Sequence, residues 1–222
     1  MGASAYHIIE NYQSVIEGDA IVEIGSARGE GSTDYFIQYA KDHKKHFYTI
    51  DVRQDVVDFF QGQQIKNFSA ICCETIDFIG QIQGPLCFVY MDSFDYIPPD
   101  DSIKHDWMQQ MIAEYKARHP NDPSQWLTNE NSARHHLERT ISLLPLMSDR
   151  SIFLFDDTFV PSQLDHVGWF KNAFDPNSNE YHQWFGKGAT AVPYLLGKGW
   201  NVLPKTHVTT RDDFTALANF IL

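Results

Sequence analysis

The sequence predicts an α/β fold in which a mostly parallel sheet carries helices on both faces. Short apolar runs alternate along the chain with amphipathic segments, and the first apolar run leads through a glycine-rich loop directly into a helical pattern. The chain has 222 residues and is 43% hydrophobic, which is enough for one domain with a full core. We therefore expect residues 1–222 to form a single domain.

The elements follow in order along the chain. The apolar runs predict strands over 20–24, 46–50, 68–72, 86–91 and 151–155. The amphipathic stretches between them predict helices over 5–16, 32–42, 53–61, 75–82, 104–118, 130–146 and 188–198. We expect the last segment, residues 200–222, to add two strands as an antiparallel hairpin.

The loop after the first strand predicts a cofactor site. It carries three glycines, which let the backbone turn sharply and approach a ligand: Gly25, Gly29 and Gly31. The helix that follows offers free N–H groups at its N-terminus to polar ligand atoms. A ligand that contains a nucleoside is the expected occupant. The alternative is that these glycines only close a tight turn.

The order of the glycines indicates which cofactor binds. The dinucleotide fingerprint is G-x-G-x-x-G, whereas residues 25–31 read G-x-x-x-G-x-G. Glu23 lies two residues before the first glycine, where a carboxylate repels a pyrophosphate but suits a cationic ligand such as S-adenosylmethionine. Asp51 ends the second predicted strand, at the spacing where an acid accepts hydrogen bonds from ribose hydroxyls.

This arrangement resembles the first motif of class I S-adenosylmethionine-dependent methyltransferases. The resemblance implies a Rossmann-like, doubly wound sheet of seven strands with helices on both faces. It also implies cofactor contacts from Glu23, Gly25, Ser26, Gly29, Gly31, Ser32, Asp51, Glu74 and Asp92. A dehydrogenase or other dinucleotide enzyme of the same broad fold remains the first alternative.

Carboxylates follow two further strands. Asp92 comes directly after the apolar run 86–91, and Asp156 and Asp157 follow 151–155. Neighbouring parallel strands end at the same edge of a sheet, so these three carboxylates are expected to gather beside the cofactor and repel one another. A divalent cation such as Mg²⁺ removes that repulsion and takes oxygen ligands. The alternative is that the aspartates cap helices or bind an amine.

The same pattern resembles the metal site of cation-dependent small-molecule O-methyltransferases, which include catechol-type and macrocin-type sugar enzymes. The resemblance implies that Asp92, Asp156 and Asp157 hold the metal and that the substrate is a small hydroxylated molecule, a sugar or a catechol-like diol. Catechol-type enzymes carry a lysine base three residues after the first metal aspartate, whereas this chain has Asp95 there. Asp95 is the candidate base, with His135 and His136 as alternatives, although a histidine pair on a polar helix face is more often solvated.

Two segments interrupt the alternation of strands and helices, residues 97–129 and 158–187. Both follow predicted strand ends, where open α/β sheets bind ligands, so we expect them to cover the active site. The second segment is rich in aromatic residues, which alternatively form a small satellite core or an oligomer contact. The sequence leaves a homodimer open.

Charge and hydropathy exclude several function classes. The formal net charge of −12 argues against a nucleic acid as partner. No apolar window is long enough for a membrane span and no signal-peptide pattern is present, so we expect a cytoplasmic protein. The remaining alternatives are a metal-independent N- or C-methyltransferase and a non-catalytic subunit that binds the cofactor.

Overall fold

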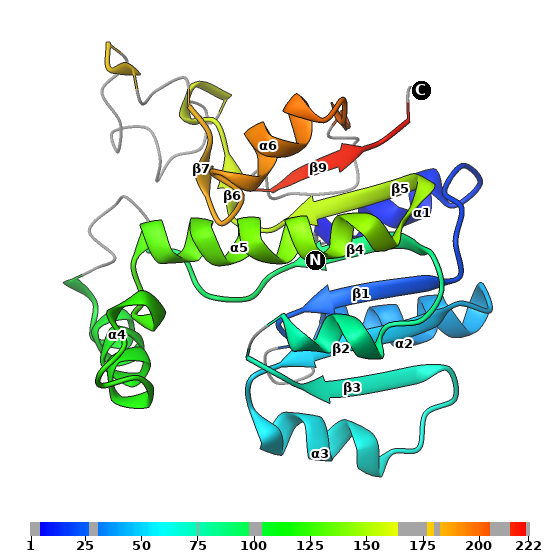
Figure 1. The fold of residues 1–222 in the computed structure, drawn as a ribbon, viewed down its shortest axis with the longest axis horizontal. Coiled ribbons are helices and arrows are strands. Elements are labelled where there is room, and N and C mark those ends of the chain that lie inside the picture. Colours follow the sequence, from blue (N-terminus) through cyan, green and yellow to red (C-terminus); the bar gives the residue numbers. More distant parts are fainter. Residues whose placement is uncertain are drawn as a thin grey trace.

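The computed structural model describes residues 5–26, 31–74, 76–97, 104–163, 177–179, 183–204 and 214–220. Its main feature is a seven-stranded sheet with the strand order β3-β2-β1-β4-β5-β9-β8 (Figure 1). The five strands from β3 to β5 are parallel, and β9 and β8 follow as antiparallel neighbours. The predicted seven-stranded α/β fold with a C-terminal antiparallel hairpin is confirmed.

The first four strands of the sheet lie where the apolar runs predict them, and the fifth begins at Met147 rather than at residue 151. Their bounds are β1 Ala20–Ile24, β2 His46–Asp51, β3 Phe68–Cys72, β4 Leu86–Met91, β5 Met147–Phe155, β8 Asn201–Val202 and β9 Thr215–Ala218. In the register of the sheet, Ile24 of β1 lies between Ile50 of β2 and Met91 of β4. The residues that follow these three strands therefore meet at one edge.

The helices differ more from expectation, mainly at their ends. Their bounds are α1 Ile8–Tyr12, α2 Ser32–Asp42, α3 Gln54–Gly62, α4 Asp106–Arg118, α5 Asn129–Leu143 and α6 Ala191–Gly197. The predicted helix over 75–82 is a short 3-10 helix, Asp77–Gln81. Helix α5 ends at Leu143 rather than 146 because Pro145 has no N–H to continue the ladder.

The first predicted helix, 5–16, is also shorter in the structure. It consists of a 3-10 turn, Ala5–His7, and α1, which ends at Tyr12. Val15 and Ile16 both donate backbone hydrogen bonds to the Tyr12 carbonyl, so the chain turns there.

Side chains that alternate along the strands build a separate core on each face of the sheet. On one face, Ile21 and Phe47 pack with α1 and α2. On the other, Val22 and Ile50 pack with α5, α6 and the 3-10 helix 77–81. This alternation explains why every residue of β1 is buried, including Glu23.

A two-stranded antiparallel ribbon that the sequence did not predict lies beyond β5. It pairs β6, Thr158–Phe159, with β7, Phe185–Gly186. Both strands belong to the second interrupting segment, of which residues 164–176 and 180–182 lie outside the described residues, with Trp169, Phe170, Phe174 and Tyr181 among them. No helix in the described ranges is long and apolar enough to cross a bilayer.

Candidate functional site

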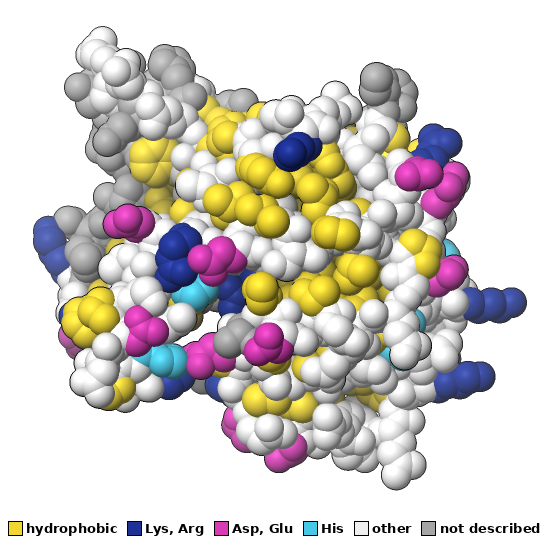
Figure 2. All heavy atoms as spheres, in the orientation of Figure 1, with side chains coloured by type: hydrophobic (Ala, Val, Ile, Leu, Met, Phe, Trp, Pro, Cys, Tyr) yellow, Lys and Arg dark blue, Asp and Glu magenta, His cyan; other side chains and the backbone are white. Residues whose placement is uncertain are grey.

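A cavity of about 460 Å³ opens where the strand order reverses, between β1 and β4. Its walls come from the carboxyl ends of β1, β2 and β4 and from α4 in the first interrupting segment. Figure 2 shows acidic and histidine side chains around the hollow beside α4. Open α/β sheets bind ligands at this position, and the volume lies in the range of cofactor pockets.

Gly25 is required where β1 enters the cavity. It has φ +94°, and a Cβ there would lie 2.5 Å from the carbonyl oxygen of Asp92. The backbone carbonyls of Ile50 and Ile24 accept hydrogen bonds from Gly25 N and Asp92 N at 2.8 and 2.9 Å, so the loops after β1, β2 and β4 form one floor. Gly31, with φ +71°, precedes α2, and Gly29 lies outside the described residues.

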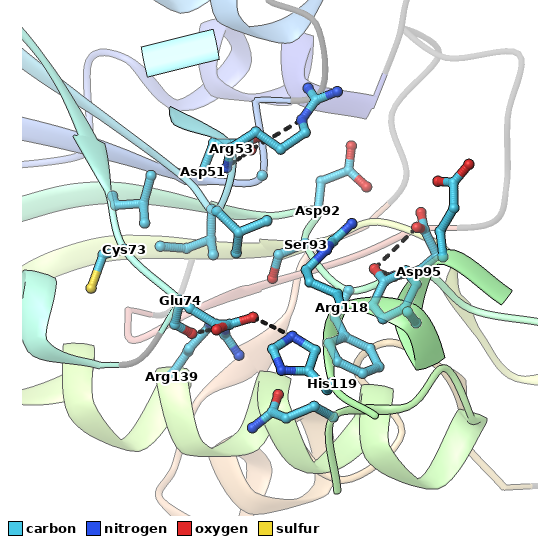
Figure 3. Close-up of a pocket in the computed structure, with 18 of the residues that line it drawn as sticks. Asp51, Arg53, Cys73, Glu74, Asp92, Ser93, Asp95, Arg118, His119 and Arg139 are labelled. Atoms are coloured by element: carbon cyan, nitrogen blue, oxygen red, sulfur yellow. Dashed lines mark hydrogen bonds and ion pairs between the residues drawn. The ribbon is translucent and has the colours of Figure 1, made fainter. Parts of the chain in front are cut away.

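Asp51, the predicted ribose acceptor, ends β2 and lines the same cavity. Its Oδ2 accepts hydrogen bonds from the backbone N–H and the hydroxyl of Ser26, both at 3.1 Å. Its Oδ1 accepts from the backbone N–H of Arg53 at 2.9 Å. Figure 3 shows Asp51 and Arg53 on one side of the pocket and Asp95 on the other. Asp92 and Ser93 lie between these two sides.

The wall of the pocket contains a hydroxyl without a partner. The Ser93 hydroxyl is buried in the cavity wall and has no hydrogen-bond partner among the described residues. A buried hydroxyl without a partner costs free energy unless a ligand or water satisfies it. Together with Gly25 and Asp51, it makes the pocket a fit for a nucleoside cofactor.

Glu74, a further predicted cofactor contact, borders the same cavity after β3. Its carboxylate pairs with the His119 ring at 2.7 Å, and its backbone carbonyl accepts a hydrogen bond from Arg139. His119 immediately follows α4, so this contact connects the interrupting segment to the end of β3 (Figure 3). The first interrupting segment therefore borders this cavity.

Glu23 lies away from the cavity wall. Its carboxylate is fully buried on the α2 side of the sheet, where Oε2 accepts hydrogen bonds from Thr33 at 2.7 Å and Thr49 at 2.8 Å. Oε1 has no hydrogen-bond partner among the described residues. Burial raises the pKa of Glu23 to about 7, despite the hydrogen bonds from these hydroxyls, which lower it.

This raised pKa predicts how stability depends on pH. The folded state prefers the protonated carboxyl, whereas the unfolded state ionises above the ordinary pKa of 4.5. The stabilisation from Glu23 is therefore complete below pH 4.5 and is lost as the pH rises through about 7. Relative to Glu23→Gln, which cannot ionise, the wild type is expected to lose roughly 2–3 kcal/mol of unfolding free energy between pH 5 and 8. Urea unfolding at several pH values measures this difference. The exposed Glu17→Gln serves as control, and parallel pH profiles for wild type and Glu23→Gln would contradict the assignment.

The three aspartates after β4 and β5 come together as predicted. Asp92, Asp156 and Asp157 each place a carboxylate oxygen within 4.8 Å of the others. This cluster lies next to the cavity, because Asp92 also lines its wall. Burial raises the pKa of Asp92, and Lys187 opposes that rise.

Lys187, for which the sequence predicts no role, reaches into the aspartate cluster. Its Nζ donates to Asp92 Oδ1 at 2.5 Å and pairs with Asp157 Oδ2 at 3.0 Å. The side chain is buried, with the whole residue 2% exposed. Burial alone lowers the pKa of Lys187, but the carboxylates of Asp157 and Asp92 raise it well above its ordinary value, so the lysine stays charged.

The aspartate cluster therefore fits a metal only in part. Three carboxylates are a suitable donor set for Mg²⁺. However, the Lys187 ammonium lies between two of them, where a divalent ion would have to bind, and the two cations would repel each other. The arrangement does not support the predicted Mg²⁺ site.

Asp95, the candidate base, faces the cavity beside Tyr115 of α4. The Tyr115 hydroxyl donates to Asp95 Oδ2 at 3.2 Å and accepts from the Asp95 backbone N–H at 3.3 Å. Both residues line the cavity, so this carboxylate is accessible to a bound acceptor. Proton abstraction by Asp95 remains a prediction.

The alternative bases, His135 and His136, are buried rather than solvated, contrary to the more frequent arrangement for such a pair. His135 stacks on Phe94 with ring centroids 4.4 Å apart, and burial lowers its pKa to about 4. Burial also lowers the pKa of His136 well below its ordinary value, and its Nδ1–H donates to the Ser132 carbonyl at 2.7 Å. Among the described residues that line the cavity there is neither His135 nor His136, so both rings pack inside the fold.

No family model matches this sequence, and no curated protein matches it. Solved structures do match. A protein assigned as an rRNA methylase from Clostridium thermocellum superposes with a TM-score of 0.52 at 10% identity, over 98% of this chain and 97% of that one. A protein assigned as a methyltransferase from Streptococcus mutans, in complex with SAH, gives a TM-score of 0.50 at 10% identity, over 98% and 99%. The chain has the Rossmann-like methyltransferase fold.

The sequence did not indicate that Lys187, Tyr115 and His119 lie in or beside the candidate site. A signal for the first was present, since Lys187 lies between Gly186 and Gly188 in an otherwise apolar context. No local pattern marks the other two, because α4 reaches the cavity only in the folded chain.

Proposed function

We propose that this protein is an S-adenosylmethionine-dependent methyltransferase that methylates an oxygen of a small hydroxylated acceptor. The observation that supports this most is the cavity at the reversal of strand order, where Gly25, Asp51 and Ser93 offer close backbone approach, a ribose acceptor and a free hydroxyl. The likeness to a SAH-bound structure of the same fold agrees with it.

In this proposal the residues of the chain bind and orient both ligands. Asp51 exchanges its contacts with Ser26 for the ribose hydroxyls, and Glu74 and Ser93 contact the rest of the nucleoside. When bound, the cofactor supplies an electrophilic methyl group on its sulfonium sulfur. Asp95 accepts the proton of the attacking hydroxyl as the new carbon–oxygen bond forms and the carbon–sulfur bond breaks. Most of the acceleration then comes from positioning.

The acceptor class follows from the base. A carboxylate is a weak base toward a sugar hydroxyl but closer in pKa to a phenolic one, so a catechol-like diol suits Asp95 better than a sugar. The net charge of −12 argues against an RNA acceptor, although one structural neighbour is assigned as an rRNA methylase.

Metal-assisted O-methylation is the competing candidate, and the grouping of Asp92, Asp156 and Asp157 favours it. In that case a divalent ion would bring the acceptor hydroxyl to the methyl group and make it more acidic. Turnover that disappears in EDTA and returns with Mg²⁺ would establish this candidate instead.

Calorimetric titration with S-adenosylmethionine and with SAH, each in Mg²⁺ and in EDTA, tests the proposal. We expect both ligands to bind in both buffers, and a catechol screen to give a product heavier by one methyl group. Binding of NAD without binding of S-adenosylmethionine would instead establish a dinucleotide enzyme. Cofactor binding without turnover on any diol would favour an N- or C-methyltransferase or a non-catalytic subunit.

A further inference from the structure

The aspartate cluster already contains a cation. The Lys187 ammonium touches Asp92 and Asp157, and the Asp156 carboxylate belongs to the same cluster. A flexible surface lysine would pair with such carboxylates only intermittently, whereas this side chain is buried along its length. The contact of Lys187 with Asp92 and Asp157 is therefore a permanent feature of the folded chain.

The backbone around Lys187 is built to hold the ammonium there. The β6–β7 ribbon places Gly186 opposite Thr158, and the Lys187 N–H donates to the carbonyl of Asp157 at 3.1 Å. A Cβ on Gly186 would lie only 1.6 Å from that carbonyl oxygen. The lysine and one of its carboxylate partners thus belong to backbones in direct contact.

The next residue secures the same geometry. The Gly188 N–H donates to the Thr158 hydroxyl at 2.8 Å, and that hydroxyl donates to the Asp156 carbonyl at 2.9 Å. A Cβ on Gly188 would lie 2.8 Å from the Thr158 side chain. The two glycines that flank Lys187 are therefore both needed for close approach to the segment that carries Asp156 and Asp157.

The cluster also contacts the proposed cofactor pocket through one residue. Asp92 lines the cavity, and its Oδ1 accepts from Lys187 while its Oδ2 accepts from the Tyr90 hydroxyl at 3.3 Å. Both oxygens are therefore fixed. Lys187 does not line the cavity in the described part of the chain, so it acts on the site through Asp92.

We propose that Lys187 is the permanent cation of this site, taking the place of a divalent metal ion and positioning Asp92 for a transferase that works without metal. The ammonium neutralises part of the repulsion among the three carboxylates, which is the task a bound ion would have. The positioning of Asp92 for catalysis rests on the proposed function; the replacement of the metal does not.

Removal of the ammonium should expose a metal site. We expect wild-type protein not to bind Mn²⁺ at millimolar concentrations by electron paramagnetic resonance, and Lys187→Met to bind it at least about tenfold more tightly than wild type. Lys187→Arg keeps the charge and should gain nothing, and Lys198→Met, which removes an exposed lysine of the same region, should behave as wild type. Adding Asp156→Asn to Lys187→Met should weaken the new Mn²⁺ site.

Turnover gives a second measurement. With an acceptor identified, the wild-type kcat should be the same in EDTA and in Mn²⁺, whereas Lys187→Met should lose kcat in EDTA and regain part of it with Mn²⁺. If Lys187→Met lost kcat only because its fold is less stable, Mn²⁺ would not restore kcat.

Mn²⁺ binding by the wild type that Asp156→Asn abolishes would overturn the proposal. So would a folded Lys187→Met that gains no Mn²⁺ affinity. If Lys187→Met fails to fold, the wild-type and Lys187→Arg titrations still decide. Mn²⁺ binding is read without substrate, so absence of methyl transfer would count against the proposed function alone.

Discussion

Replacing Gly186 with alanine is expected to destabilise the protein by about 3 kcal/mol and to abolish methyl transfer. Gly186 has φ +88°, where an L side chain is strained, and its Cβ would overlap the Asp157 carbonyl oxygen at 1.6 Å. The β6–β7 ribbon must therefore separate, which removes Lys187 from Asp92 and Asp157. For a domain of this size the melting temperature should fall by roughly 6–12 °C.

Differential scanning calorimetry and a turnover assay measure the two effects. Gly197→Ala is the matched control, because Gly197 ends α6 and no atom lies within 4 Å of the site of its Cβ. That variant should be neutral or slightly stabilised, since alanine is the better helix former. Equal melting temperatures for Gly186→Ala and wild type would show that the ribbon does not hold Lys187.

Asp51→Ala is expected to weaken S-adenosylmethionine binding about 100-fold. Hydrogen bonds from ribose hydroxyls to a carboxylate contribute about 1.5–3 kcal/mol each, and loss of their acceptor costs at least one such contribution in full. Asp51 is buried in the cavity wall, and its two oxygens are directed by the donors of Ser26 and Arg53. Isothermal titration calorimetry with S-adenosylmethionine and SAH measures the change.

The control for this variant is Asp55→Ala, which removes an exposed carboxylate at the start of α3 and should leave affinity unchanged. Because Asp51 also organises the loop at Ser26, circular dichroism and melting of the unliganded variant must accompany the titration. Wild-type affinity in a well-folded Asp51→Ala would exclude this carboxylate as the ribose ligand.

The parallel sheet and the residues at its edge could be predicted from local sequence patterns. Apolar runs of five or six residues are a local property, so β1 to β4 lie where they were expected. Asp51 ends β2, and Asp92 and Asp156 directly follow β4 and β5. Strand ends of a parallel sheet converge, so the grouping of Asp92, Asp156 and Asp157 was also predictable. The ends of the helices were less predictable, because proline, short 3-10 turns and packing decide where a helix stops.

The groups that contact those carboxylates became visible only in the folded chain. Lys187 follows Asp92 by 95 residues and reaches it through a ribbon whose two strands carry no hydrophobic repeat long enough to recognise. In the same way, α4 brings Tyr115 and His119 to the cavity from a segment that was expected near the active site, but without these two residues being marked. The burial of Glu23, His135 and His136 likewise depends on helices packed over the sheet. Local patterns set strands and turns, whereas the charge balance of the site depends on contacts between distant segments, which no local pattern encodes.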